Sequence, residues 1–403
     1  MSPRAFEEAD LKNPIVFVFP GHEPDVRLMV FKQEIHVHSH ILKERSIYFC
    51  KFLDSPDKQD KSVPDSALFR YDYSTVVDED GTWGLEAAAK APLLTEEMIS
   101  QTEDMEGEVE GFRQLLCAMY SRPYTIKSVE ELSTLTRIAD FYCALPIVSV
   151  TLTDALLDSP IFLKRENEDS TACTKDQLAE DCDSMIFIAQ KLRSSVLFRE
   201  CLIHIVANWK DKDTFKFHRT RNDEIIRGLI EAGFSQLDEM IDHLQHTLYI
   251  EAVMAKNSLD TPELTKTLAA AEEDYVSFQR EPKIAVAFWK DLSAKLVHVG
   301  GDADFLKSEI DPLLVNNLVL DRNNEGPGEG CYKYCFLCAE IADKQMPNTE
   351  VEAMWDGGRQ TWGKVLIGGS ITNWIVGYIN EELRYRELIS HMQQTEEDFQ
   401  SKL

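Results

Sequence analysis

The sequence of 403 residues lacks any run of about 18 apolar residues, so we expect no membrane-spanning helix. Its first residues also lack the basic and apolar regions of a secretory signal peptide. Cysteine is sparse, and the nine cysteines are an odd number scattered along the chain, a usage typical of reduced thiols. Together these features predict a cytoplasmic or nuclear protein.

Positive charge is scarce, because 42 Lys and Arg oppose 70 Asp and Glu and give a net charge of −28. Such a chain repels nucleic-acid phosphates and anionic lipids, so we expect neither a nucleic-acid nor a membrane partner. The most basic segment, residues 210–221, also contains acidic residues, and we interpret it as a solvated loop. Its basic and aromatic residues are Lys210, Lys212, Phe215, Lys216, Phe217, Arg219 and Arg221.

Recognisable catalytic patterns are also missing: the sequence has no Ser-His-Asp grouping and no dinucleotide-binding glycine fingerprint. We therefore predict no enzymatic activity and no cofactor. The strongest chemical candidate is the set Cys331, Cys335 and Cys338, whose spacing is that of three thiolates binding a [4Fe–4S] cluster. Such a cluster lies early in a βα barrel, whereas only 65 helix-like residues follow here, so core or loop thiols are favoured over a zinc site or a cluster.

Three further patterns have a structural explanation that we favour over a functional one. Residues 358–365 nearly match a phosphate-binding loop, but Val365 replaces the Ser or Thr that would hold Mg²⁺. The alternating histidines at 36, 38 and 40 could chelate zinc on a strand, but the strand is expected to end near His38. Cys201 and His204 lie one helical turn apart on an inward-facing stripe, which favours core packing over a nucleophile–base pair.

The clearest local pattern lies in residues 25–53. Apolar side chains alternate with others in Val26–Val30 and Ile35–Val37, as in two short strands with one face in a core. We expect residues 32–34 to form the turn between them. From Ser39 the apolar residues recur at helical spacing, so a hairpin leading into an amphipathic helix is predicted.

Four residues of this segment, Asp25, His38, Ser46 and Phe49, resemble the opening motif of a BTB/POZ domain. The segment Phe112–Tyr120 with the following Pro123–Thr125 is similar to the third helix and the next strand of that family. The resemblance covers residues 15–160. More loosely, residues 161–255 resemble the helical extension of large fungal BTB proteins.

The expected fold is therefore an α/β BTB/POZ-like domain, a small mixed sheet flanked by helices, followed by a mainly α-helical region. Within the insertion we expect a hairpin, because alternation from Phe69 to Val77 is followed by a turn signal and Trp83. Residues 96–110, with seven acidic and no basic residues, are expected to be a solvated segment. The predicted parts are a polar tail (1–14), the BTB/POZ-like domain (15–160) with an acidic insertion (about 54–108), a helical extension (161–320), a linker (321–330) and a C-terminal helical segment (331–403).

The resemblance implies protein–protein interaction, with self-association or binding to a cullin as a ubiquitin-ligase substrate adaptor. The side chains expected at the interface are Tyr48, Phe52, Met119 and Tyr120, whereas Phe49 and Leu116 are expected in the core. Two departures weigh against a cullin: no hydrophobic-x-Glu element follows the second helix, and Ser39 replaces the usual lysine after the motif histidine. The alternatives are a non-ligase dimeric scaffold or transcription-associated regulator, and a metal- or cluster-dependent enzyme.

Overall fold

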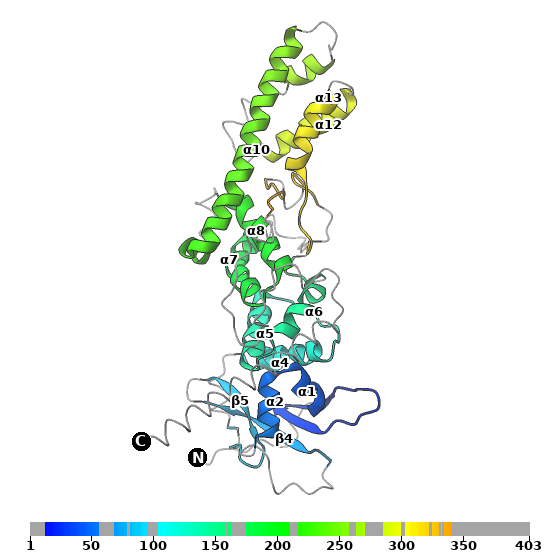
Figure 1. Cartoon of the computed structure of the whole chain (residues 1–403), viewed down its shortest axis with the longest axis vertical. Coiled ribbons are helices and arrows are strands. Elements are labelled where there is room, and N and C mark those ends of the chain that lie inside the picture. The colour runs from blue at the N-terminus through cyan, green and yellow to red at the C-terminus, as the bar shows by residue number, and fades with distance from the viewer. Residues whose placement is uncertain are drawn as a thin grey trace, which may run out of the picture. The chain divides into compact units, whose positions relative to one another are not determined.

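The computed structural model describes two compact units, which divide between Ala155 and Leu156 and are considered one at a time (Figure 1). The residues described are 13–55, 68–78, 81–92, 94–95, 104–157, 159–162, 175–209, 217–257, 263–270, 285–299, 303–321, 325–329, 332 and 334–340.

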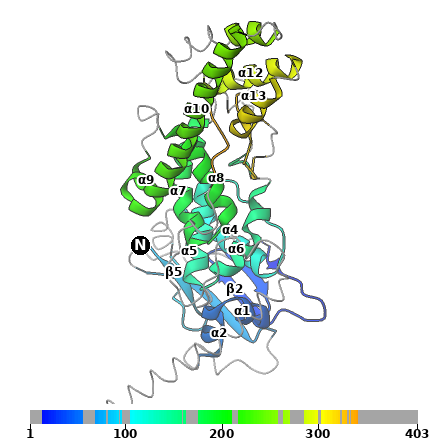
Figure 2. The same ribbon diagram turned by 45° about the horizontal axis from the view of Figure 1, so that its top comes forward.

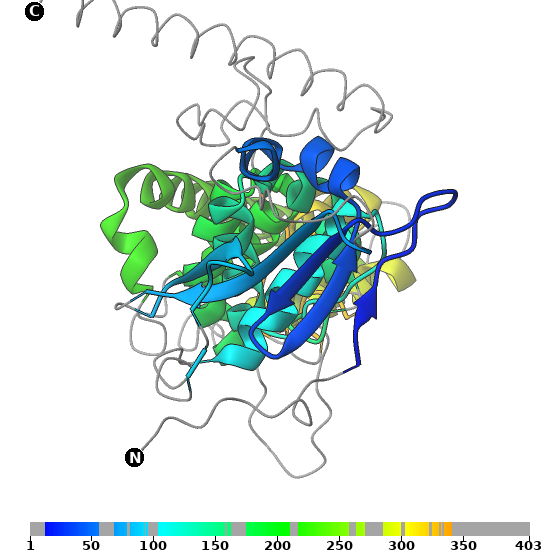
Figure 3. The same cartoon turned by 90° about the horizontal axis from the view of Figure 1, so that it is seen from below.

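The first unit is built on a five-stranded mixed sheet with strand order β1-β3-β2-β4-β5. Strand β1 runs parallel to β3, β3 antiparallel to β2, β2 parallel to β4, and β4 antiparallel to β5. Figure 3 shows the β2–β3 hairpin in dark blue beside β4 in lighter blue. The strands are β1 (Ile15–Val16), β2 (Val26–Val30), β3 (Gln33–Val37), β4 (Tyr71–Val77) and β5 (Trp83–Ala87). A small mixed sheet followed by mostly helical structure confirms the predicted fold class at this coarse level.

The predicted β2–β3 hairpin is present, but its turn lies earlier than the sequence indicated. The turn is Phe31–Lys32, and residues 33 and 34 already belong to β3. Phe31 has a φ of 53°, a conformation that the sequence pattern does not favour for a bulky residue. Its ring is buried against Trp83 at 5.3 Å, and its N–H donates to the Thr75 Oγ1 at 2.9 Å. Tertiary contacts with β4 and β5 therefore select this turn.

The strand β4 joins the sheet parallel to β2, and the connection between them contains the helices α1 (Ser39–Arg45) and α2 (Ile47–Asp54). Alternate residues of β4 are buried, as the sequence predicted, and β5 returns antiparallel to it. The hairpin expected within the insertion is thus confirmed.

Three helices complete this unit: α4 (Met105–Met119), α5 (Val129–Phe141) and α6 (Leu145–Leu157). Part of the acidic segment that was expected to be solvated is in fact the start of α4. Asp104 caps this helix, and acidic residues in its first turn suit the positive end of the helix dipole. Glu108 also accepts the indole N–H of Trp83 at 2.8 Å and pairs with Arg137, which holds the first turn against neighbouring elements.

The second unit is mainly helical, and Figure 2 shows α12 and α13 beside the long helix α10. Its elements are α7 (Lys175–Lys191), α8 (Ser195–Asn208), α9 (His218–Asn222), α10 (Glu224–Asn257), a helical stretch at 263–270, α12 (Ala285–Val299), α13 (Ala303–Ile310) and the 3-10 turn η3 (Asp311–Leu314). The apolar pattern of the sequence favours two helices, at 225–232 and 237–254, but the structure has one continuous helix, because Gly233 stays helical where α10 passes close to α8. A Cβ on Gly233 would lie 3.3 Å from Val206.

Residues from the end of the predicted helical extension and from the start of the predicted C-terminal segment pack on α8. We call residues 315–321, 332 and 334–338 the α8 strap. Its side chains Tyr332, Cys335 and Leu337 are buried with Ile203 in one apolar cluster. Residues 1–12 and 341–403, including the phosphate-loop-like 358–365 and the predicted terminal helix, lie outside the described residues.

Candidate functional site

The residues of the opening motif form a hydrogen-bonded network around the start of α1. The Asp25 carboxylate accepts from the Ser39 backbone N–H at 2.7 Å and from its hydroxyl at 2.6 Å. His38, which is 1% exposed, meets the Tyr120 hydroxyl through its backbone N–H (2.7 Å) and through Nδ1 (2.9 Å). Since its Nε2 lies 3.2 Å from the His22 carbonyl, which can only accept, the tautomer that fits is Nε2–H. The two bonds from Ser39 use both carboxylate oxygens of Asp25.

A second network links α2 to the end of α5. Ser46 caps α2 by accepting the Phe49 N–H at 3.0 Å, and its hydroxyl donates to the Tyr142 carbonyl at 2.6 Å. The Phe49 ring stacks on the Tyr142 ring with centroids 5.1 Å apart. Burial raises the pKa of Tyr142 well above its ordinary value. Phe49 and Leu116 are both 0% exposed, which confirms that they belong to the core.

The four side chains expected at an interface have different surroundings. Met119 is 1% exposed and Phe52 is 8% exposed, so both pack in the core. Tyr48 and Tyr120 are partly exposed. Tyr48 stacks on Phe52 at 5.1 Å and lies 5.6 Å from Phe141, whose ring is 51% exposed. An interface role therefore stays a prediction for the two tyrosines, and Phe141 is an exposed neighbour that the sequence reading omitted.

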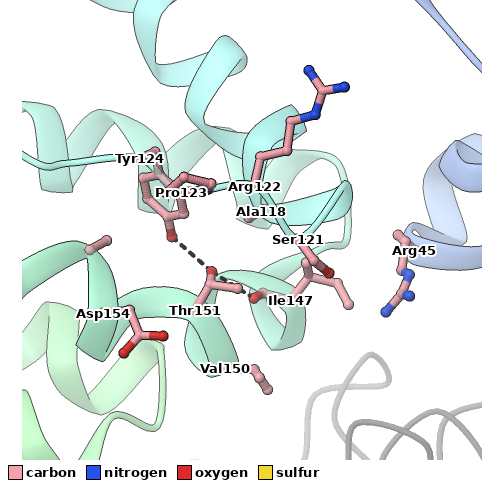
Figure 4. A pocket seen from close by; sticks show the side chains of 11 residues that line it. Arg45, Ala118, Ser121, Arg122, Pro123, Tyr124, Ile147, Val150, Thr151 and Asp154 are labelled. Carbon is pink, nitrogen blue, oxygen red and sulfur yellow. Dashed lines mark hydrogen bonds between the residues drawn. The ribbon is translucent and has the colours of Figure 1, made fainter. Parts of the chain in front are cut away.

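This unit contains a cavity of about 400 Å³ (Figure 4). It lies between the ends of α1 and α4, the segment that follows α4, and α6. Apolar side chains of α6 form one wall, and polar groups lie around it. The lining residues are Arg45, Ala118, Ser121, Arg122, Pro123, Tyr124, Ile147, Val150, Thr151, Asp154 and Ala155.

The polar groups of this cavity are unevenly satisfied. The Tyr124 and Thr151 hydroxyls are 2.9 Å apart, and burial raises the pKa of Tyr124 to about 12. Arg122 donates to the Val18 carbonyl at 2.9 Å. Arg45 differs, because its Nε–H is buried and meets no acceptor in the part of the chain that the structure describes, while its Nη2 lies 4.0 Å from Glu44. A buried N–H without an acceptor is costly, so this guanidinium favours an incoming carbonyl or carboxylate.

The hydroxyl groups that line the cavity belong to Ser121, Tyr124 and Thr151. Thr151 bonds to Tyr124 and to backbone carbonyls of its own helix, and among the described contacts none joins a lining hydroxyl to a histidine or carboxylate. Such a pair is the usual requirement for nucleophilic catalysis. A cavity of this volume suits a small ligand or the side chains of a bound segment. The sequence reading missed it, because its walls come from four separate elements.

The alternating histidines do not share one strand. His36 contacts Glu34 at 2.7 Å on the sheet, His38 is buried, and His40 is exposed on α1 with its ring 5.5 Å from that of His38. Partial desolvation of the ring, followed by the neighbouring His22 and His38, lowers the pKa of His40. Among the residues described, no three potential ligands come together to hold a metal ion.

The C-terminal cysteines and the Cys201–His204 pair lie in the second unit. Cys331 is outside the described residues, Cys335 is 1% exposed, and burial raises the pKa of Cys338 to about 11, which disfavours a thiolate. Cys201 and His204 are 0% and 4% exposed, which confirms the predicted core packing. Most of the basic segment 210–221 lies outside the described residues; within it, Phe217 is buried.

Within the part of the chain that the structure describes, none of the helices has the length and apolar character needed to cross a bilayer. Comparison of the chain with protein-family models, with curated proteins and with solved structures finds no match.

Proposed function

We propose that this chain is a protein-interaction protein whose N-terminal unit is a BTB/POZ-type module. The proposal is supported by the order of elements, in which a hairpin leads into the α1–α2 helices and β4 returns parallel to β2. It is also supported by the roles of the motif residues Asp25, His38, Ser46 and Phe49, each of which joins separate segments of the unit.

The observation that carries the binding role is the cavity between α1, α4 and α6. Its apolar wall and its polar groups resemble the make-up of protein interfaces, in which an apolar centre is surrounded by a polar rim. We propose that it receives one or two side chains of a partner helix, an aliphatic or aromatic one against Ile147 and Val150 and a carbonyl or carboxylate towards Arg45.

The partner that we propose is a cullin-type scaffold, with this chain as a substrate adaptor of a ubiquitin ligase. The sequence offers no hydrophobic-x-Glu element after α2, and Asp25 is engaged by Ser39. Anchoring on the cullin would therefore depend on the α1–α4–α6 cavity more than on the loop that follows α2.

The test is affinity purification of the tagged full-length protein with mass spectrometry of its partners, using a matched pair of variants. Val150→Arg fills the cavity with a charged side chain at a partly exposed position of α6, whereas Ser133→Arg adds the same side chain to the exposed face of α5. We expect Val150→Arg to reduce recovery of the cavity-dependent partner at least tenfold, and Ser133→Arg to leave it unchanged. Circular dichroism would verify that both variants are folded.

Each outcome decides a part of the proposal. Cullin and ligase subunits that disappear with Val150→Arg would support the adaptor. Other proteins that disappear instead would support the interaction module and overturn the cullin. A set of partners that is the same in wild type and both variants would overturn the cavity as the docking site.

A second candidate, a dimeric scaffold, is favoured by the edge of the sheet. Val16 ends the edge strand β1, and Val18 and Phe19 lie just beyond it; their side chains are 43%, 65% and 37% exposed. Apolar side chains that are exposed together form a surface on which another chain can pack. Light scattering would test it: a dimer that becomes a monomer in Val18→Lys supports the scaffold, whereas a wild-type monomer at micromolar concentration contradicts it.

A further inference from the structure

The second unit contains a buried carboxylate that holds a distant backbone segment. Glu200 lies in α8 and is 1% exposed. Its carboxylate accepts from the backbone N–H groups of Val319 at 2.9 Å, Leu320 at 3.3 Å and Asp321 at 3.3 Å. These donors belong to the α8 strap and are about 120 residues away in sequence. One side chain therefore satisfies three consecutive amides of a segment without regular secondary structure.

None of the strongest influences on the pKa of this carboxyl group is a cation. The strap contributes the Asp321 carboxylate, which accepts from the Tyr332 hydroxyl. The neighbouring helices contribute the thiols of Cys182 on α7 and Cys201 on α8. His204, one turn along α8, lies 6.0 Å from the Tyr332 ring. Among the described residues, an ionised Glu200 would thus be a buried negative charge that faces a second carboxylate and is stabilised mainly by backbone N–H dipoles.

We propose that the α8 strap is held by a proton-dependent clasp, in which Glu200 binds a proton when the strap docks and loses it when the strap is released. Docking buries the carboxyl group beside Asp321, whereas release returns it to water. The strap would therefore dock more tightly in mildly acidic than in alkaline solution. Release would also uncover the apolar cluster of Ile203, Tyr332, Cys335 and Leu337.

The direction of this pH dependence follows from the pKa of Glu200 in the docked and in the released state. Burial, outweighing the three N–H donors, raises the pKa of Glu200 to about 7 in the docked state. In the released state the pKa falls towards its ordinary value. The docked state thus binds the proton more tightly, so docking is strongest below the released-state pKa and weakens as the pH rises through about 7.

Amide hydrogen exchange of the full-length protein tests the clasp. With intrinsic exchange rates corrected for pH, the protection factors of Val319, Leu320 and Asp321 should fall on the order of tens-fold between pH 5.5 and pH 8. Glu200→Gln, a neutral side chain of the same shape that still accepts hydrogen bonds, should make these protection factors independent of pH. The amides of Met185 and Ile186 in α7 report opening of the whole unit and should change much less.

A second variant keeps the test decisive if Glu200→Gln does not fold. Asp321→Asn removes the neighbouring charge but keeps the backbone N–H and an acceptor for Tyr332, so the midpoint of the change should move to lower pH. Strap protection that is constant with pH in the wild type would overturn the proposal. So would an unchanged pH profile in Glu200→Gln, or an unshifted midpoint in Asp321→Asn.

Discussion

Buried polar side chains join segments that are far apart in the sequence, each by bonding to the backbone of another element. Thr75 accepts the Phe31 N–H at 2.9 Å and donates to the Met29 carbonyl at 3.0 Å. Asp183 accepts the backbone N–H groups of Arg219 and Thr220, each at 2.8 Å, at the start of α9. Because an unpaired buried polar group costs more than a hydrogen bond gains, these residues determine which backbone segments can meet.

Replacing Ser46 should lower the stability of the first unit. Ser46→Ala removes the cap of α2 and the donor to the Tyr142 carbonyl, and we expect it to lower the free energy of unfolding by about 2 kcal/mol. Urea unfolding followed by circular dichroism would measure it. Ser133→Ala, on the exposed face of α5, should change stability by less than about 0.5 kcal/mol. An equal effect of the two substitutions would contradict this role of Ser46.

The residue types alone predicted part of the core. The burial of Val26, Leu28 and Val30 follows from their alternation, and all three are 0% exposed. The partners of Glu200 could not be predicted, because three backbone amides about 120 residues away leave no pattern in the residue types. The same is true of the cavity, whose lining depends on where α1, α4 and α6 end relative to one another.

Secondary-structure elements differ in how far they depend on local sequence. The amphipathic stripe of α12 and the Ser194 cap of α8 were both predictable, and Ser194 accepts the Leu197 N–H at 3.3 Å. The unbroken course of α10 was not predictable, since Gly228 and Gly233 both weaken a helix locally. Packing against α8 offsets this weakness at Gly233 but not at Gly228.

The two glycines of α10 should therefore respond differently to alanine. Gly228 is exposed and a Cβ there meets nothing within 4 Å, so we expect Gly228→Ala to raise the free energy of unfolding by about 0.5–1 kcal/mol. At Gly233 the added methyl group would press on Val206 at 3.3 Å, and the gain should be smaller or reversed. Thermal unfolding of the two variants side by side gives the comparison. A larger gain at Gly233 would show that this contact is not tight.

At the scale of the whole molecule, the chain is organised as two compact units. We expect a fragment of residues 1–160 to fold without the rest of the chain, since its sheet and helices α1 to α6 contain the networks of Ser46 and His38. A cooperative urea transition and dispersed amide resonances would support this expectation. A fragment that binds a dye specific for exposed apolar surface and melts without cooperativity would contradict it.

The first unit should also be sensitive to alkali. Burial raises the pKa of Tyr48 and of Tyr124 to about 12, and it also raises the pKa values of Tyr120 and Tyr142 above the ordinary value. Because these folded-state values lie above the ordinary value of 10, their contribution to stability is complete below pH 10 and is lost as the pH rises towards 12. Phenolate absorbance and circular dichroism should therefore change together in this range. Tyrosines that ionise near pH 10 in a protein that remains folded would contradict the assignment.

The turn at Phe31 has a consequence for the order in which the chain folds. The hairpin of β2 and β3 is local in sequence, yet the turn residue has a φ of 53° and relies on Thr75 and Trp83, which come from a later hairpin. A peptide of residues 25–38 alone would lack both contacts, and we expect it to populate this hairpin only weakly. During synthesis the hairpin would then reach its final form after β4 and β5 have emerged. The segment whose pattern is clearest in the sequence therefore reaches its final conformation only when β4 and β5 have joined the sheet.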